Sequence, residues 1–346
     1  MNKVSLNFHL TENNRKIAYK KLEGKSTEEP GIIFLGGLAS DMEGTKANYL
    51  EEWCRLRGNA FIRFDYSGHG RSEGIFTDGS ILTWSEDALS VLDNLTNKKQ
   101  ILIGSSMGGW IALILAKKRP QKIHSMIGIA AAPDFTEDLM WDNFSKAENI
   151  KISKHGVIEQ NSEYSDEPYK ISKNLIFESR NCFVLRDKIE LNFPVRLLQG
   201  TSDNDVPLNT AINLINHITC EDAKLEIIKN ADHSFSTKEC LKLISSNLLK
   251  LLEKKPEAFN LLNIYSEVSK INLEKVLIEM SGKEYSFVKN KLADLLVSEI
   301  CPVGKKINKL MNDKAYLLEI LRKGTEKARI KAEENLKNIR EKVGLI

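Results

Sequence analysis

The stretch Ile101-Leu-Ile-Gly-Ser-Ser-Met-Gly-Gly109 decides the fold, because an apolar run leads into Gly-Ser-Ser-Met-Gly and then into a helical pattern from Trp110 to Ala116. A serine with glycine two residues away on each side is typical of a sharp strand-to-helix turn. Such a turn lifts the serine hydroxyl above the sheet and places the next backbone N–H at a helix N-terminus, where negative charge is stabilised. We therefore predict that Ser106 is a nucleophile.

Short apolar runs recur on both sides of this turn, with helical patterns between them. Strands this apolar are buried on both faces, which predicts an α/β fold with a mostly parallel sheet flanked by helices. The first two segments alternate between polar and apolar residues, which indicates an antiparallel hairpin at the sheet edge. We expect eight strands, at Val4–Leu10, Lys16–Leu22, Ile32–Leu35, Ala60–Phe64, Ile101–Ile103, Met126–Ala130, Val195–Leu198 and Leu225–Ile228.

The alternation of strands and helices stops in two places. Between Pro133 and Pro194 the chain becomes polar and irregular, and an insertion there, at about residues 133–193, would cover the active site as a lid. A plain long connection is the alternative. After about Lys255 the apolar runs vanish and amphipathic helices follow. We therefore expect an α/β domain at 1–254 and an all-α module at 256–346.

Composition narrows the function classes. The net charge of +3 is small beside 50 basic and 47 acidic residues, so neither nucleic acid nor a membrane surface is indicated as a partner. The five cysteines are odd in number and widely spaced, and the N-terminus lacks the profile of a signal peptide. We predict a cytoplasmic protein without a membrane span, without a cofactor and without a metal, and leave its oligomeric state open.

A serine hydroxyl needs a base to remove its proton, so the turn predicts an acid and a histidine further along the chain. Asp203 follows the apolar run 195–200, and His233 follows the next run, so both stand where the strands of an α/β sheet end. His233 would act as general base, and Asp203 would orient its imidazole. Asp205 is a competing acid, whereas Asp232 is read as a turn residue.

Two backbone N–H groups are candidates for an oxyanion hole. One belongs to Met107, directly after the nucleophile. The other belongs to Leu38, because the preceding Gly36-Gly37 pair allows the loop to turn this N–H toward the same point. His69 lies in the glycine-rich turn Asp65–Ser72 beside the expected pocket, and a structural role is favoured over a chemical one.

Several segments together resemble the α/β-hydrolase superfamily over about residues 30–253, and within it proteins described as acyl-protein thioesterases and acyl-glucuronide esterases. The resemblance implies a catalytic triad at Ser106, Asp203 and His233. Gly36-Gly37-Leu38 stands where these relatives have Pro-Gly-Tyr. The matching segments are Gly44–Ala47, Ile62–Gly68, Ile103–Trp110, Pro194–Leu198 and Asp232-His233.

Residues 256–346 resemble the helical C-terminal part of bacterial tryptophanyl-tRNA synthetases, although the ATP-binding signatures of those enzymes are absent from the sequence. Two functions are therefore considered. The first is a serine esterase or thioesterase that acts on a small acyl ester or an acylated protein through an acyl-serine intermediate. The alternative is a tRNA-binding or interaction protein that uses the synthetase-like tail without aminoacylation.

Overall fold

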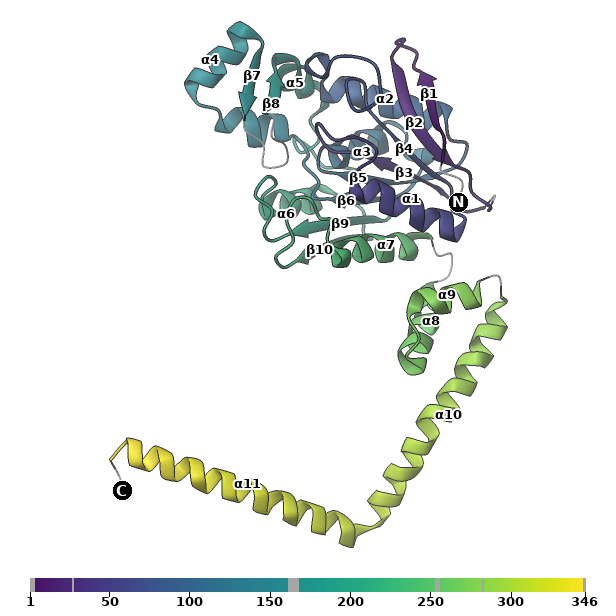
Figure 1. The fold of residues 1–346 in the computed structure, drawn as a ribbon, viewed down its shortest axis with the longest axis vertical. Helices are drawn as coiled ribbons and strands as arrows, with labels where there is room; N and C mark the ends of the chain where they lie inside the picture. Colours follow the sequence, from purple (N-terminus) through teal and green to yellow (C-terminus); the bar gives the residue numbers. More distant parts are fainter. Residues whose placement is uncertain (1–3, 27, 161–167, 253–255, 282, 345–346) are drawn as a thin grey trace. The chain divides into compact units, whose positions relative to one another are not determined.

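The structure is a computed structural model, and it describes residues 4–26, 28–160, 168–252, 256–281 and 283–344. The chain divides into two compact units, Met1–Leu252 and Glu253–Ile346, and each is described by itself (Figure 1). The boundary expected at 254–256 falls beside this division, but residues 254 and 255 lie outside the described ones. Within the ranges given above, no helix combines the length and the apolar character needed to cross a membrane.

The first unit is built on one eight-stranded sheet. Its spatial order is β1 (Leu6–Leu10), β2 (Lys16–Leu22), β4 (Phe61–Phe64), β3 (Gly31–Leu35), β5 (Gln100–Ser105), β6 (Ile123–Ile129), β9 (Val195–Gly200) and β10 (Ala223–Ile228). Neighbours from β4 to β10 pair in parallel, whereas β2 is antiparallel to both β1 and β4. The predicted sheet and its edge hairpin are therefore confirmed.

Helices cover both faces of the sheet (Figure 1): α1 (Thr45–Arg57), α2 (Ile81–Asn94), α3 (Met107–Lys118), α6 (Leu208–His217) and α7 (Lys238–Leu252), with short 3-10 turns η1 (Phe76–Asp78) and η2 (Pro120–Lys122). Side chains alternate between the faces along a strand. Ile33 therefore packs in a cluster with Trp84 of α2, whereas its neighbour Ile32 packs with Leu50 of α1 and Leu248 of α7. These two cores hold the strand ends in fixed positions.

The insertion between β6 and β9 is more regular than the sequence suggested. It contains η3 (Thr136–Met140), η4 (Trp141–Asn143), α4 (Lys146–His155), β7 (Val157–Gln160), β8 (Tyr169–Ser172), α5 (Lys173–Phe177) and η5 (Glu178–Cys182). β7 and β8 pair antiparallel in a separate two-stranded sheet. The prediction of an irregular region is therefore wrong for the described residues of the insertion. Ile152, Ile158 and Ile171 bury their side chains and so favour regular structure there. Residues 161–167 lie outside the described ones.

The two ends of the insertion are joined at their base. The buried carboxylate of Asp134 accepts hydrogen bonds from the backbone N–H groups of Val184 and Leu185 at 2.9 and 3.0 Å. Glu137 and Arg180 add a two-point ion pair at 2.7 and 2.9 Å. Bidentate pairs fix geometry as well as adding energy. The first and last segments of the insertion are thus held together by hydrogen bonds and an ion pair close to the sheet.

The second unit is helical, as predicted: α8 (Pro256–Ser269), α9 (Leu273–Met280), α10 (Tyr285–Asn312) and α11 (Lys314–Lys342). Its small core is formed by Tyr265, Val276, Met280, Val288 and Leu292, so it joins α8, α9 and the first half of α10. The described residues of α11 include none that is buried. Gly304 and Gly324 lie inside α10 and α11.

Candidate active site

The turn at Ser106 joins β5 directly to α3. Ser106 has φ 53° and ψ −118°, which is strained for a residue with a Cβ. Its N–H donates to the carbonyl of Ile129 at 2.9 Å, which helps to hold this conformation. A Cβ on Gly104 would lie 2.3 Å from the carbonyl oxygen of Gly108, and one on Gly108 would lie 2.1 Å from that of Leu35. Both positions therefore require glycine, for reasons of space alone.

Side chains from three separate segments meet at the carboxyl ends of the strands. Nε2 of His233 lies 3.0 Å from Oγ of Ser106, and Nδ1 of His233 lies 3.0 and 3.1 Å from the two carboxylate oxygens of Asp203. Parallel strands end at one edge of a sheet, which is why residues that follow β5, β9 and β10 converge. The structure thus brings the predicted Ser106, His233 and Asp203 into one hydrogen-bonded series.

The side chain of Asp203 is buried and surrounded by donors. Its carboxylate accepts from Nε2 of Gln199 at 2.9 Å and from the backbone N–H groups of Asp205 and Val206 at 3.0 and 2.8 Å, besides the ring of His233. Burial by itself would raise the pKa of Asp203, but the hydrogen bonds from His233, Val206 and Gln199 and the charge of His233 lower it below its usual range. Asp203 is therefore a carboxylate at neutral pH.

Among the described residues, Asp203, Asp205 and His233 come close enough to share a metal ion, with candidate ligand atoms within 4.8 Å of one another. Both oxygens of Asp203 already accept hydrogen bonds, and two of these come from backbone amides that a metal would displace. The donors fit a carboxylate that orients His233 better than one that binds a metal. Asp205 itself is exposed at the edge of the site.

The loop after β3 lies against the turn of Ser106, since a Cβ placed on Gly37 would be 3.6 Å from the Cβ of Ser106. Met107 is the first residue of α3, where backbone N–H groups have no partner within the helix. Within the described ranges, neither the N–H of Leu38 nor that of Met107 donates to another residue. The predicted donors thus lie on the two segments that border Ser106; their action on an oxyanion stays a prediction.

The segment that carries His233 is fixed from α1. The ammonium of Lys46 donates to the carbonyl of Ser234 at 2.5 Å. Burial lowers the pKa of Lys46, although the charges of Asp232 and Cys240 act to raise it. The carboxylate of Asp232 accepts from the hydroxyl of Ser234 at 2.8 Å, so Asp232 closes the turn, in agreement with its interpretation as a turn residue.

A cavity of about 940 Å³ opens over Ser106 and His233. One wall is formed by the loop after β3, including Leu38. The insertion contributes apolar side chains to another wall, among them Phe135, Leu139, Met140 and Tyr169. Pockets that combine an apolar lining with a few convergent polar groups are typical of sites for small organic ligands.

Sequence reasoning missed two residues that support the site. Gln199 is buried within β9 and bonds Asp203. A polar residue in an otherwise apolar run, four positions before the acid, is a signal that could have identified it. Lys46 contributed to the family resemblance only as part of Gly44–Ala47, and no local pattern indicates that it reaches Ser234, which is 188 residues away in the chain.

The comparison with known proteins gives separate relatives for the C-terminal part of the chain. The C-terminal part is 42% identical over 94 residues to tryptophan–tRNA ligase of Rickettsia felis. The match covers 27% of this chain and 28% of that protein. The C-terminal unit is therefore similar to about a quarter of a synthetase, which confirms the resemblance noted in the sequence.

Other relatives match most of the chain. Residues 32–148 match the family described as alpha/beta hydrolase fold. The chain is 37% identical over 253 residues to the mitochondrial palmitoyl-protein thioesterase ABHD10 of Bos taurus, covering 73% of this chain and 81% of that protein. Two solved structures, each 36% identical, are a hydrolase from Agrobacterium vitis, with a TM-score of 0.71, and the mouse alpha/beta hydrolase domain-containing protein 10, with a TM-score of 0.67. They cover 73% and 72% of this chain, and 100% and 99% of their own chains are matched. The protein accordingly belongs to the α/β-hydrolase family and is a hydrolase.

Proposed function

We propose that the chain is a serine hydrolase that cleaves carboxylic esters or thioesters through an acyl-serine intermediate. The proposal is carried by the continuous hydrogen bonding from Ser106 through His233 to Asp203. A neutral imidazole that accepts from a serine and donates to a buried carboxylate turns a weak hydroxyl into a nucleophile.

In the first half of the reaction, Oγ of Ser106 attacks the acyl carbon while Nε2 of His233 takes the hydroxyl proton. The charge that develops on the acyl oxygen is stabilised by the N–H groups of Leu38 and Met107. His233 then gives the proton to the leaving alcohol or thiol, and Asp203 balances the imidazolium. In the second half, water attacks the acyl-serine by the same route and releases the acid.

The substrate class is a small acyl ester or an acylated protein. The thioesterase name of the ABHD10 relatives supports thioesters, and the apolar side chains of Phe135, Leu139 and Met140 suit an acyl chain. These residues come from the insertion, which acts as the lid at about residues 133–193. A panel of p-nitrophenyl esters and acyl thioesters of increasing length would define the acyl chain length and the leaving group.

Labelling by a fluorophosphonate tests the nucleophile. The purified wild-type protein should take one label per chain and hydrolyse at least one member of the ester and thioester panel, whereas Ser106→Ala should do neither because it lacks the attacking oxygen. Both proteins should unfold at similar temperatures. A wild-type chain that takes no label and cleaves no acyl substrate would end the proposal.

Amide substitutions show which of the two competing acids, Asp203 or Asp205, orients His233. Asp203→Asn should lower kcat by roughly ten-thousandfold, because the amide cannot hold the imidazole in the required tautomer or balance its charge. Asp205→Asn serves as the matched control and should change kcat by less than about threefold, because the hydrogen bonds to Nδ1 of His233 come from Asp203. A larger loss in Asp205→Asn than in Asp203→Asn would reverse the assignment of the orienting acid.

A further inference from the structure

His69 lies outside the Ser106–His233–Asp203 series, yet its ring reaches the loop that carries Leu38. Nε2 of His69 lies 3.2 Å from the backbone nitrogen of Ala39, the residue after Leu38. Nδ1 lies 3.3 Å from the carbonyl oxygen of Ser67. The N–H of Ala39 can only donate, and the carbonyl of Ser67 can only accept. The ring of His69 is therefore neutral and carries its proton on Nδ1.

Aromatic side chains hold this ring in place. The ring centroids of Trp84, Phe76 and Tyr66 lie 4.9, 5.1 and 5.6 Å from that of His69, all in edge-to-face contact. Only 4% of His69 is exposed, and burial lowers its pKa to about 4. The ring therefore keeps its acceptor nitrogen at neutral pH and has no room to turn it elsewhere.

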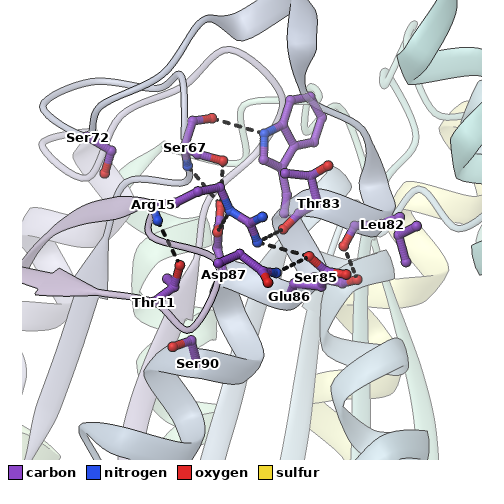
Figure 2. Close-up of polar contacts among 12 residues, drawn as sticks. Thr11, Arg15, Ser67, Ser72, Leu82, Thr83, Ser85, Glu86, Asp87 and Ser90 are labelled. Atoms are coloured by element: carbon purple, nitrogen blue, oxygen red, sulfur yellow. Dashed lines mark hydrogen bonds and ion pairs between the residues drawn. The ribbon is translucent and has the colours of Figure 1, made fainter.

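The acceptor for the Nδ1 proton is fixed in turn. Oδ2 of Asp87 accepts from the N–H and the hydroxyl of Ser67 at 2.9 and 2.6 Å, and Oδ1 of Asp87 accepts from Arg15 at 2.7 Å (Figure 2). The indole N–H of Trp84 donates to the same Ser67 carbonyl at 3.0 Å. Asp87 is fully buried. A chain of satisfied polar groups thus runs from the N-terminal hairpin to the ring of His69.

The loop after β3 needs such a support. Ala39 has φ 54°, in the left-handed region that a residue with a Cβ occupies at a cost. Fixing the N–H of Ala39 fixes the plane of the Leu38–Ala39 peptide and so limits rotation of the preceding peptide, whose N–H belongs to Leu38. Oδ1 of Asp65, from the same turn as His69, accepts from the N–H of Met42 at 2.6 Å and holds the loop at a second point.

We propose that His69 is a positioning residue for the oxyanion hole, which it serves by accepting the N–H of Ala39 and thereby aiming the N–H of Leu38. The inference rests on the proposed function, since it requires an oxyanion to be stabilised. A ring that only filled the core would be replaceable by any aromatic residue of similar size. A positioning ring would instead be replaceable only by a side chain that offers an acceptor at the place of Nε2.

Two variants separate these roles. His69→Phe keeps the aromatic packing and removes the acceptor, whereas in His69→Gln the amide oxygen can accept the Ala39 N–H. We expect kcat of His69→Phe to fall by about 10- to 100-fold with KM unchanged, somewhat less than the loss of a whole oxyanion donor. Affinity for an alkylboronic acid, which mimics the tetrahedral intermediate, should fall by a similar factor. His69→Gln should recover most of both.

Unfolding temperatures and a matched variant test whether a loss of activity comes from a general loss of stability. His124→Phe replaces a partly buried histidine at the start of β6, away from the catalytic end of the strands, and should leave kcat unchanged. Equal kcat in wild type and His69→Phe would overturn the positioning role while leaving the proposed function intact. Equal losses in His69→Phe and His69→Gln would also overturn it. A wild-type protein without acyl hydrolysis would end both proposals.

A measurement on the wild-type protein serves if His69→Phe does not fold. Nitrogen NMR of 15N-histidine-labelled protein distinguishes the two neutral tautomers and shows which ring nitrogen accepts a hydrogen bond. We expect one histidine ring to stay neutral at pH 5 with its proton on Nδ1. Its signals are assigned to His69 because they should be missing from the spectrum of His69→Gln. If no ring showed this state at pH 5, the inference would be overturned.

Discussion

The buried, neutral ring of His69 makes the stability of the hydrolase unit depend on pH. Burial lowers its pKa to about 4, whereas a histidine in the unfolded chain titrates near 6.5. Below pH 6.5 the unfolded chain therefore binds a proton that the folded chain does not. The free energy of unfolding should fall by roughly 3 kcal/mol as the pH drops from about 6.5 to about 4, and should be independent of this group above 6.5.

His69→Gln removes this titration, so the difference in unfolding free energy between wild type and variant should shrink as the pH falls from 7 to 4.5. Urea unfolding at the two pH values measures it. A difference that stays constant would show that His69 does not titrate below its ordinary range. Asp87, the charged group that favours the protonated ring, is present in both proteins.

At the residue scale, the sequence could predict Ser106, Asp203 and His233 because each follows a recognisable strand and the order Ser, Asp, His limits the choice. It favoured Asp203 and kept Asp205 as a competing acid, since the positions of two side chains in one turn depend on the backbone of that turn. In the structure Asp203 lies against the ring of His233. The support from Gln199 and His69 depends on contacts between segments far apart in sequence, which no local pattern contains.

At the scale of elements, the start of α1 is joined to the loop between β10 and α7. Besides the apolar packing of Ala47 against the cluster that holds Phe235, a hydrogen bond runs from Lys46 to the carbonyl of Ser234, next to His233. Lys46→Met should lower kcat by roughly tenfold, because the loop that carries the proposed general base, His233, loses a charge-assisted hydrogen bond. KM should change little.

Lys46→Gln is the matched control, because its amide can still donate to Ser234. Steady-state kinetics on one ester substrate should rank kcat as wild type, then Lys46→Gln, then Lys46→Met. If Lys46→Met were as active as the wild type, the loop would have to be held by its own turn at Asp232.

The elements that sequence predicted best were those buried on both faces. The central strands read as continuous apolar runs, and they occur where expected. β7 and β8 were missed because each has four residues and a mixed pattern, and their pairing depends on the fold of the insertion. Gly304 and Gly324 lie inside α10 and α11, because a single glycine costs only about 1 kcal/mol in a helix and the surrounding sequence can outweigh it.

At the scale of the whole molecule, the residues proposed for catalysis all lie in Met1–Leu252, together with both cores that hold the strands. A chain ending at Glu253 should therefore keep kcat/KM within about twofold of the full chain. The same pair of proteins tests the alternative function. With lysines and glutamates mixed along α11, equal and weak tRNA retention by both is expected.

Filter binding at two salt concentrations measures the tRNA retention, and ester hydrolysis measures the catalytic unit. Stronger, salt-sensitive retention by the full chain alone would support a tRNA-binding role for the helices. A shortened chain that folds but loses activity would instead show that the helical unit contributes to catalysis. The cytoplasmic location predicted from the sequence stays a prediction.

The strained backbone at Ser106 also decides which substitution suits an inactive variant for trapping a bound substrate. Alanine keeps a Cβ, so Ser106→Ala retains the conformational cost at φ 53° and the same neighbouring contacts. Glycine would release that cost and let the turn relax toward other shapes. An inactive chain meant to capture the proposed acyl substrate should therefore carry alanine, since a glycine variant would be more stable but would bind on a turn of altered shape.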